Sequence, residues 1–249
     1  MPCLGVFRRS LSPCIPLEFS HFMQTPHQHS KNFLADALRN ETIQLGLEIP
    51  DHVILHLAAY AKSLWDWNTR LNLTRHTDIQ HFVERDITDT AALCPHINAD
   101  EHVLDVGTGG GVPGVILAIL RDDLTVELSD TSTKRVAALQ SILNEVGLPL
   151  KIHHKPAQQV VLTAIESNHP FHSLVIRAVA PLRKLLTWFE PISDSYDRLL
   201  IIKGPRWESE KQEARHHGLL KTITARRIAS WPISRSNTES VLLEVKKRT

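Results

Sequence analysis

Residues 103–120, VLDVGTGGGVPGVILAIL, place five glycines between an apolar strand pattern and an apolar helix pattern. Gly109, Gly111 and Gly114 satisfy the spacing G-x-G-x-x-G, which is informative only where a strand precedes it and a helix follows. Both flanks meet that condition. Glycine tolerates tight turns and lets a ligand approach the backbone, because it carries no Cβ. The stretch therefore predicts a loop that cradles a nucleotide-like ligand, with a plain glycine-rich turn as the alternative.

Downstream of this loop, strand and helix patterns alternate. Strands are expected at residues 102–106, 124–130, 148–154, 172–179 and 197–204, with helices at residues 112–120, 133–147, 157–167 and 181–189. This alternation predicts a parallel sheet with helices on both faces. Two further β-rich runs, residues 219–229 and 237–247, have no helix between them and predict an antiparallel pair at the sheet edge. The expected fold class is α/β, Rossmann-like, with a mostly parallel seven-stranded sheet.

The chain divides into three parts by pattern. Residues 1–30 are rich in Pro, Ser and His, which is typical of a disordered leader, and Met23 is an alternative start. Residues 31–97 are expected to form a helical segment, because apolar side chains recur at helical spacing in its first half and again over residues 78–93. Residues 98–249 are expected to form the Rossmann-like core.

The charge balance limits how a nucleic acid could bind. The 28 Lys and Arg residues against 27 Asp and Glu give a net charge of +1, so no global field would attract RNA. An RNA-binding surface would have to be a local patch. Basic residues cluster at positions 70–75, 203–206, 226–227 and 246–248. Each cluster alone is most simply a solvated face, but convergence of two or three around the cofactor cleft would predict RNA binding that weakens steeply with salt.

Other site types are not expected from the composition. The three cysteines are too scattered for a disulfide framework, and the fifteen histidines lack partners at metal-ligand spacing, so no metal is predicted. No apolar run approaches the roughly 20 residues that span a bilayer. We therefore expect a cytoplasmic monomer that does not bind membranes.

Two acids bear on the identity of the ligand. Asp130 ends the second expected strand, where an acid can bind the ribose hydroxyls of either a nicotinamide dinucleotide or S-adenosylmethionine. Asp105 ends the first strand, beside the glycines, where a carboxylate would repel a pyrophosphate and attract the cationic amino group of S-adenosylmethionine. S-adenosylmethionine is therefore the predicted cofactor, and a helix-capping role for Asp105 is the alternative. The terminal antiparallel pair also favours a class I methyltransferase over a dehydrogenase.

Several motifs together resemble the RsmG (GidB) family of bacterial methyltransferases, which modify a guanine at N7 in 16S ribosomal RNA. The motifs are VLDVGTGGGVPGV, LSDTSTKRV, VIRAVAPL, IIKGP and, upstream, LWDWNTRLNLT. They occur in order over residues 45–247. The combination of the WN–NLT segment with DVGTGGGVPG is specific, whereas either half alone is less so.

The resemblance implies roles for particular residues. Gly107 and Val112 would contact the cofactor, and Ala157 and Gln158 would border its adenine. Arg177 would line the junction between cofactor and target base.

Two more positions match residues that face the same cleft in relatives. These are Asn72 and Lys203, which become candidates for handling RNA. The sequence also departs from the family pattern. Gln158 stands where many relatives carry an acid, and Arg85 is followed by Asp86 where relatives often have histidine.

The chemistry implied by the resemblance needs alignment more than proton transfer. Guanine N7 carries a free lone pair, so it can attack a methyl group without a general base. Arg177 and Asn72 are therefore expected to position the base, and an ion pair from the fourth strand to a helix is the alternative role for Arg177. Trp207 is expected to be an exposed platform for stacking, while Trp65 and Trp67 are expected in the core.

The predicted partner is 16S rRNA or the small ribosomal subunit. A nicotinamide-dependent oxidoreductase and a non-catalytic RNA-binding protein on the same fold remain as alternatives.

Overall fold

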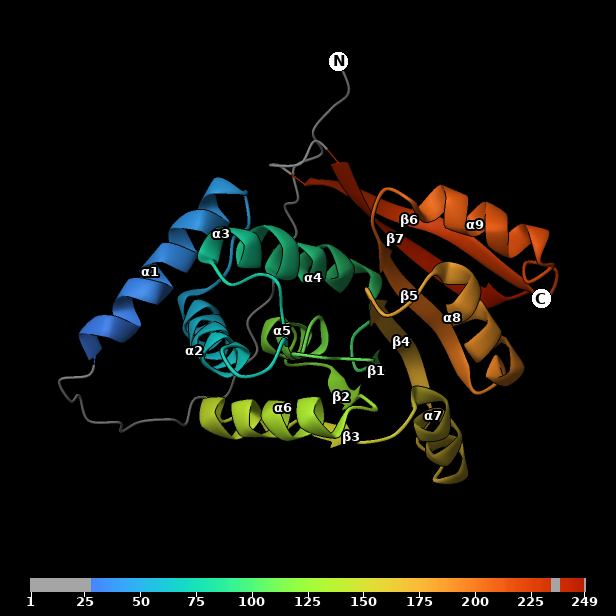
Figure 1. Ribbon diagram of the computed structural model, residues 1–249, viewed down its shortest axis with the longest axis horizontal. Helices are drawn as coiled ribbons and strands as arrows, with labels where there is room; N and C mark the ends of the chain where they lie inside the picture. The colour runs from blue at the N-terminus through green and yellow to red at the C-terminus, as the bar shows by residue number, and fades with distance from the viewer. Residues whose placement is uncertain (1–27, 234–237, 249) are drawn as a thin grey trace, which may run out of the picture.

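The computed structural model describes residues 28–233 and 238–248, and its centre is one seven-stranded sheet (Figure 1). The strand order is β3-β2-β1-β4-β5-β7-β6. The strands are β1 (His102–Val106), β2 (Thr125–Ser129), β3 (Lys151–His153), β4 (Phe171–Arg177), β5 (Tyr196–Lys203), β6 (Ile223–Ile233) and β7 (Thr238–Lys247). Strands β1 to β5 pair in parallel, while β7 pairs antiparallel with both β5 and β6. The predicted fold class is confirmed.

The helices occupy most of the predicted positions. They are α1 (Gln28–Gln44), α2 (Asp51–Asn68), α3 (Ile79–His81), the π-helical η1 (Phe82–Ile87), α4 (Thr88–Leu93), the 3₁₀ turn η2 (Cys94–His96), α5 (Gly114–Leu120), α6 (Thr133–Val146), α7 (Ala157–Glu166), α8 (Leu182–Phe189), the 3₁₀ turn η3 (Glu190–Ile192) and α9 (Trp207–His216). The helix expected at residues 78–93 is thus divided among α3, η1 and α4. Helix α9 was not predicted, because its sequence WESEKQEARH has no apolar stripe and buries only Trp207 and Ala214.

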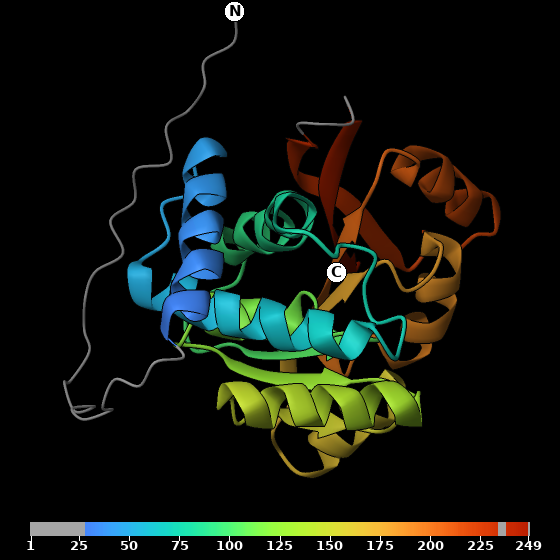
Figure 2. The same ribbon diagram turned by 60° about the vertical axis from the view of Figure 1, so that its left-hand side comes forward.

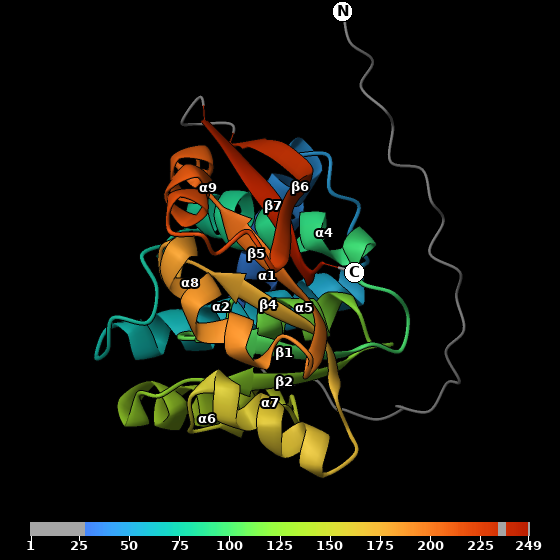
Figure 3. The same ribbon diagram turned by 90° about the vertical axis from the view of Figure 1, so that its right-hand side faces the viewer.

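The two faces of the sheet carry separate hydrophobic cores. Side chains alternate between faces along each strand. Val103 and Val175 point into a core shared with α1, α2, α5 and α6, while Leu104 and Leu174 point into a core shared with α7, α8 and α9. Figure 1 shows α8 and α9 on one side of β4 and β5, and α1, α2 and α4 on the other; Figure 3 views the molecule from the side of α8 and α9. Figure 2 shows α2 lying beside α6.

The N-terminal helices share their core with the sheet. Leu57 and Leu64 of α2 belong to the same buried cluster as Ile116 of α5 and Leu139 of α6. The boundary between the helical segment 31–97 and the Rossmann-like core 98–249 remains a prediction. Residues on both sides of this boundary contribute to the same hydrophobic core. Of the predicted leader, residues 1–27 lie outside the described residues, and α1 begins at Gln28.

The outer strand of the C-terminal antiparallel pair, β6, forms one edge of the sheet. Pro232, which the sequence placed in the link between the two β runs, lies within this strand. Proline has no N–H to donate, so a strand at the sheet edge is one of the few strand positions that tolerates it. A register shift between Arg227 and Ala229 adds an irregularity to the same strand.

Candidate active site

The glycine loop, residues 107–113, lies where the strand order reverses. Strand β1 is followed by α5 on one face of the sheet and its neighbour β4 by α8 on the other. In open α/β sheets, the carboxyl ends of two such strands form the crevice in which ligands bind. The loop after β4 reaches this crevice, since a Cβ added to Gly107 would lie 2.9 Å from Cγ2 of Val179.

The glycines of this loop have different roles. Gly107 and Gly109 have φ values of +68° and +58°, in the left-handed region that favours glycine. Around Gly109 the space is open, because the nearest heavy atom to an added Cβ is the carbonyl oxygen of Gly107 at 3.9 Å. Gly111, at φ +108°, faces inward, where a Cβ would lie 2.6 Å from Val115 and 2.9 Å from the Tyr60 hydroxyl. The backbone at Gly109 is therefore accessible to a ligand, while Gly111 is needed for packing.

Asp105 lies beneath the loop rather than at its entrance. Its side chain is buried, and its Oδ2 accepts hydrogen bonds from the Thr108 hydroxyl at 2.6 Å and the Gly114 N–H at 2.9 Å. It therefore ties the loop to the first residue of α5, which is the capping role named as the alternative. Burial raises the pKa of Asp105 to about 6, outweighing the hydrogen bonds from Thr108 and Gly114 that lower it. Its Oδ1 is buried with no hydrogen-bond partner among the described residues.

Asp130 occupies the predicted place after β2. Its Oδ2 accepts from the Gly109 N–H at 3.0 Å, and its Oδ1 from the Ser132 N–H at 2.8 Å. The carboxylate therefore contacts the accessible part of the glycine loop directly. Each oxygen of an ionised carboxylate can accept a further hydrogen bond, so Asp130 keeps capacity for ligand hydroxyls.

Arg177 ends β4 and is held by two buried acids. Its Nη1 lies 2.7 Å from Oδ1 of Asp86 in η1, and its Nε lies 3.1 Å from Oδ2 of Asp89 in α4. Asp86 also contacts Nδ1 of His76 at 2.7 Å, and Asp89 accepts from Nε1 of Trp231 at 2.9 Å. Burial alone would lower the pKa of Arg177, but the charges of Asp86 and Asp89 outweigh it and raise the pKa. The alternative role, an ion pair between the fourth strand and a helix, is thus present.

Asn72 lies on the loop between α2 and α3, next to the glycines. Asn68 shapes this loop, because its Oδ1 accepts from the N–H groups of Leu73 and Thr74 at 2.7 and 2.9 Å. The carbonyl oxygen of Leu73 would lie 3.2 Å from a Cβ on Gly110, so the two loops touch. The Asn72 side chain is exposed, which leaves its amide available at the rim of the glycine loop.

The Lys203 side chain contacts other residues of the protein. Its Nζ donates to the carbonyl oxygen of Ala180 at 2.7 Å and lies 2.7 Å from Oε2 of Glu210 in α9. The same Oε2 accepts from the N–H of Leu182, the first residue of α8. Only 10% of the Lys203 side chain is exposed. Lys203 therefore fastens the loop that follows β4 to α9.

The residues expected around the adenine lie on the same edge of the sheet. Ala157 and Gln158 open α7 directly after β3, and Ala157 is buried while Gln158 is half-buried. Val112, in the glycine loop, is also half-buried and packs against the core on the α5 side. The carboxyl ends of parallel strands meet at one edge, so these positions can border a ligand that extends from Gly109 past β2.

The predictions for the three tryptophans have different outcomes. Trp207 was expected to be an exposed stacking platform, and this is wrong, because the side chain is 9% exposed and lies under Lys211 and Arg227. Trp65 and Trp67 are partly buried against the core, as expected, and Nε1 of Trp65 donates to the backbone of the loop after α2.

Sequence reasoning missed the buried polar cluster behind the glycine loop. The Tyr60 hydroxyl donates to the Gly110 carbonyl oxygen at 2.8 Å, and burial raises the pKa of Tyr60 well above its ordinary value. His76 and Asp89 were also not singled out. Asp86 stood out only as a departure from the family pattern, and that departure was the available signal.

The site fits S-adenosylmethionine. The accessible backbone at Gly109 can receive a small polar group, and Asp130 beside it can bind ribose hydroxyls. In residues 28–233 and 238–248, no three His, Cys, Asp or Glu side chains are grouped to hold a metal ion. No helix in that part of the chain is both long and apolar enough to cross a membrane.

Comparisons with known proteins agree with this geometry. A relative from Rhodopirellula baltica, "Ribosomal RNA small subunit methyltransferase G", is 41% identical over 190 residues, covering 76% of this chain and 80% of its own. A relative of the same name from Yersinia pestis is 35% identical over 166 residues, covering 66% and 78%. Among solved structures, an O-methyltransferase from Bacillus cereus in complex with SAH has a TM-score of 0.55 at 14% identity, covering 87% of this chain and all of that one, and shows the same fold.

The family model described as rRNA small subunit methyltransferase G (GidB) matches residues 54–236. Together with the fold, this match confirms the predicted methyltransferase and its methyl donor, S-adenosylmethionine. The oxidoreductase and the non-catalytic RNA-binding protein are not favoured. The chain belongs to the rRNA small subunit methyltransferase G (GidB) family.

Proposed function

We propose that this protein transfers a methyl group from S-adenosylmethionine to N7 of a guanine in 16S rRNA, acting in the cytoplasm as a monomer. The observation that carries the proposal is the accessible backbone of Gly109, bonded to Asp130 at the reversal of strand order. The names of the relatives supply the class of substrate, a ribosomal RNA of the small subunit.

We assign the binding of the methyl donor to the edge of the sheet formed by β1, β2 and β3. Gly107, Gly109 and Val112 would line its amino-acid part, and Asp130 would accept from its ribose hydroxyls. Ala157 and Gln158 would border the adenine, as in the family pattern, with the Gln158 amide oxygen able to accept from the adenine amino group. The donor supplies a methyl carbon made electrophilic by the attached sulfonium.

The protein's own contribution to the reaction would be alignment. Guanine N7 needs no deprotonation before it attacks, so a strong general base is not required. Holding nucleophile and methyl carbon in line can contribute on the order of 7–11 kcal/mol to the rate. Arg177 suits this role because Asp86 and Asp89 hold its guanidinium in one place. We infer that Lys203 acts indirectly, by fixing the Ala180 backbone in the loop beside Arg177.

Asn72→Ala tests whether the loop after α2 positions the target base. The side chain is exposed, so its removal should leave the thermal unfolding temperature and the affinity for S-adenosylmethionine unchanged. We expect kcat for transfer to RNA to fall about 10-fold or more, since loss of alignment acts on the reacting complex. The matched control is Thr77→Ala, an exposed side chain of the same loop, which should transfer like the wild type. Unchanged turnover in Asn72→Ala would remove this residue from the site.

The proposal as a whole is tested by labelling the modified base. Purified protein is incubated with S-adenosylmethionine carrying a labelled methyl group, and with either naked 16S rRNA or small subunits that lack the modification. The RNA is then digested and its nucleosides are separated. We expect the label in 7-methylguanosine at one position, and the faster-labelled substrate is the preferred one. Label on another atom, or no label on either RNA, would contradict the proposal.

A further inference from the structure

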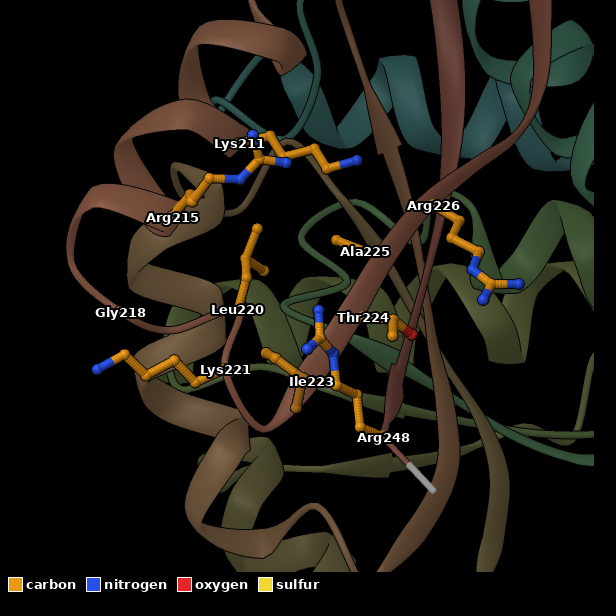
Figure 4. Close-up of a pocket in the computed structure, with 10 residues that line it drawn as sticks. All are labelled: Lys211, Arg215, Gly218, Leu220, Lys221, Ile223, Thr224, Ala225, Arg226 and Arg248. Carbon is orange, nitrogen blue, oxygen red and sulfur yellow. The ribbon is translucent and has the colours of Figure 1, made fainter.

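A cavity of about 550 Å³ lies at the far edge of the sheet, between α9 and β6 (Figure 4). Five of the residues that line it are cations: Lys211, Arg215, Lys221, Arg226 and Arg248. Among the residues that the structure describes, no Asp or Glu lines it. In a chain whose net charge is only +1, this is a local concentration of positive charge.

The protein does not neutralise these cations. Within the described residues, none of the five forms an ion pair with an acid, and two of the three acids of α9 pair with cations outside the cavity, while the third, Glu208, is exposed. Glu210 pairs with Lys203 at 2.7 Å, and Glu213 pairs with Arg183 at 2.7 Å. Lys211 additionally lies 5.9 Å from the centre of the Trp207 ring. The charge is therefore available to an external anion.

Three of the cations converge over an apolar floor. Figure 4 shows Lys211 and Arg215 extending from α9, and Arg248 extending from the end of β7 toward the same space. Leu220, Ile223 and Ala225 form the floor beneath them. These segments are brought together because β6 pairs with β7, with Ile223 opposite Lys247. Arginine suits phosphate groups, since its planar guanidinium can donate two parallel hydrogen bonds.

This surface is remote from the glycine loop. Strand β6 stands four places from β1 in the sheet, which is roughly 19 Å at the usual strand spacing. The cavity also lies toward the amino end of β5, because Leu199 pairs with Val245 and the chain of β7 continues past it to Arg248. The glycine loop lies at the carboxyl end of β1. A single small ligand cannot contact both places, whereas a structured RNA can.

We propose that the α9–β6 basic surface, made by Lys211, Arg215 and Arg248, binds the phosphate backbone of the RNA substrate away from the modified base. The inference rests on the proposed function for the choice of RNA. Contacts to phosphates fix the orientation of a nucleic acid without reading its sequence. The surface would thus set how the RNA lies across the sheet, while the residues around the glycine loop engage the target guanine.

The test compares two double variants with the same change in charge. Arg215→Gln with Arg248→Gln removes two of the proposed phosphate contacts. Lys62→Gln with Lys184→Gln, two exposed lysines on α2 and α8, is the matched control. Binding of an unmodified 16S rRNA transcript is measured between 50 and 200 mM KCl, together with the thermal unfolding temperature and the affinity for S-adenosylmethionine.

We expect the slope of log affinity against log salt to become shallower by about 1.5 in the Arg215–Arg248 variant, because each phosphate contact contributes about 0.7–0.9. The loss of RNA affinity in this variant, relative to the wild type, should therefore be about eightfold smaller at 200 mM than at 50 mM KCl. The control should keep the wild-type slope, and both variants should bind S-adenosylmethionine normally. In transfer assays, KM for RNA should rise while kcat is unchanged.

If the Arg215–Arg248 variant has the same salt slope as the control, the inference is overturned. These cations would then bind a partner other than RNA. That outcome with normal methyl transfer leaves the proposed function intact. Conversely, a shallower slope in the variant with no methyl transfer by the wild type would support the RNA surface and contradict the proposed function.

Discussion

The glycine-loop end of the sheet and the α9–β6 edge use charge in opposite ways. Near the glycine loop, charged groups are buried and paired, as Arg177 is with Asp86 and Asp89. At the α9–β6 edge, Arg215 and Arg248 have no acid partner among the described residues. Buried charges are costly unless paired, so the first arrangement is tied to stability. Exposed cations cost little, so the second can be changed without loss of the fold.

The largest difference between the two regions is expected when one arginine in each is replaced by glutamine. Arg177→Gln should lower the free energy of unfolding by about 3–5 kcal/mol, because it leaves two buried carboxylates without their counter-charge. Arg215→Gln should change it by less than about 0.5 kcal/mol. Urea unfolding of both variants and the wild type measures the difference. Similar losses in the two variants would show that the regions do not differ as described.

A second pair of variants compares the glycines. An added Cβ at Gly114 would lie 2.4 Å from Leu128 Cδ2 and 2.6 Å from Asp105 Oδ2, so Gly114→Ala should cost about 3 kcal/mol through overpacking. At the other edge Gly218 has φ +76°, but the nearest atom to an added Cβ is 3.6 Å away. Gly218→Ala should therefore lower the free energy of unfolding by only about 1–2 kcal/mol, because alanine is disfavoured in the left-handed backbone conformation. Urea unfolding is again the measurement, and a larger loss for Gly218→Ala would contradict this account of packing.

A smaller, pH-dependent effect is expected at Asp105. Its folded-state pKa, about 6, lies above the ordinary value of 3.8, so the folded protein holds this proton more tightly than the unfolded chain. The resulting stabilisation is complete below about pH 4 and is lost as the pH rises through about 6. Relative to Asp105→Asn, the wild type should lose about 2–3 kcal/mol of unfolding free energy between pH 4 and 6.5.

The control for this pH dependence is Glu208→Gln, an exposed acid on α9. Its unfolding free energy should follow the wild type across the same pH range. Parallel curves for the wild type and Asp105→Asn would show that Asp105 does not hold a proton in the folded state at pH 5.

Local patterns were enough to predict much of the fold and part of the site. The glycine loop and Asp130 could be predicted because their spacing lies within one strand–helix–strand unit. An ion pair from Arg177 to a helix was considered, but its partner Asp86 could not be identified, because the two residues lie far apart in the chain and the π-helical turn of η1 places the acid. Helix α9 was missed because its polar sequence depends on tertiary contacts.

The basic surface was also beyond sequence reasoning. Clusters at residues 226–227 and 246–248 were noted, but each alone was interpreted as a solvated face, and the only convergence considered was around the cofactor cleft. The structure instead brings Arg226 and Arg248 together with Lys211 and Arg215 at the far edge. This convergence needs both the predicted pairing of β6 with β7 and helix α9, and α9 could not be predicted because its polar sequence has no apolar stripe.

The most direct test of the central claim, that the methyl donor binds over Gly109, is equilibrium dialysis of labelled S-adenosylmethionine with the wild type and Gly109→Val. A valine side chain would occupy the open space at this position in a backbone conformation that disfavours it. We predict that the wild type binds one equivalent and that the variant loses at least 10-fold in affinity, while Gly147→Val, at a glycine with similar φ at the end of α6, binds normally. Equal affinity in a folded Gly109→Val variant would contradict the account.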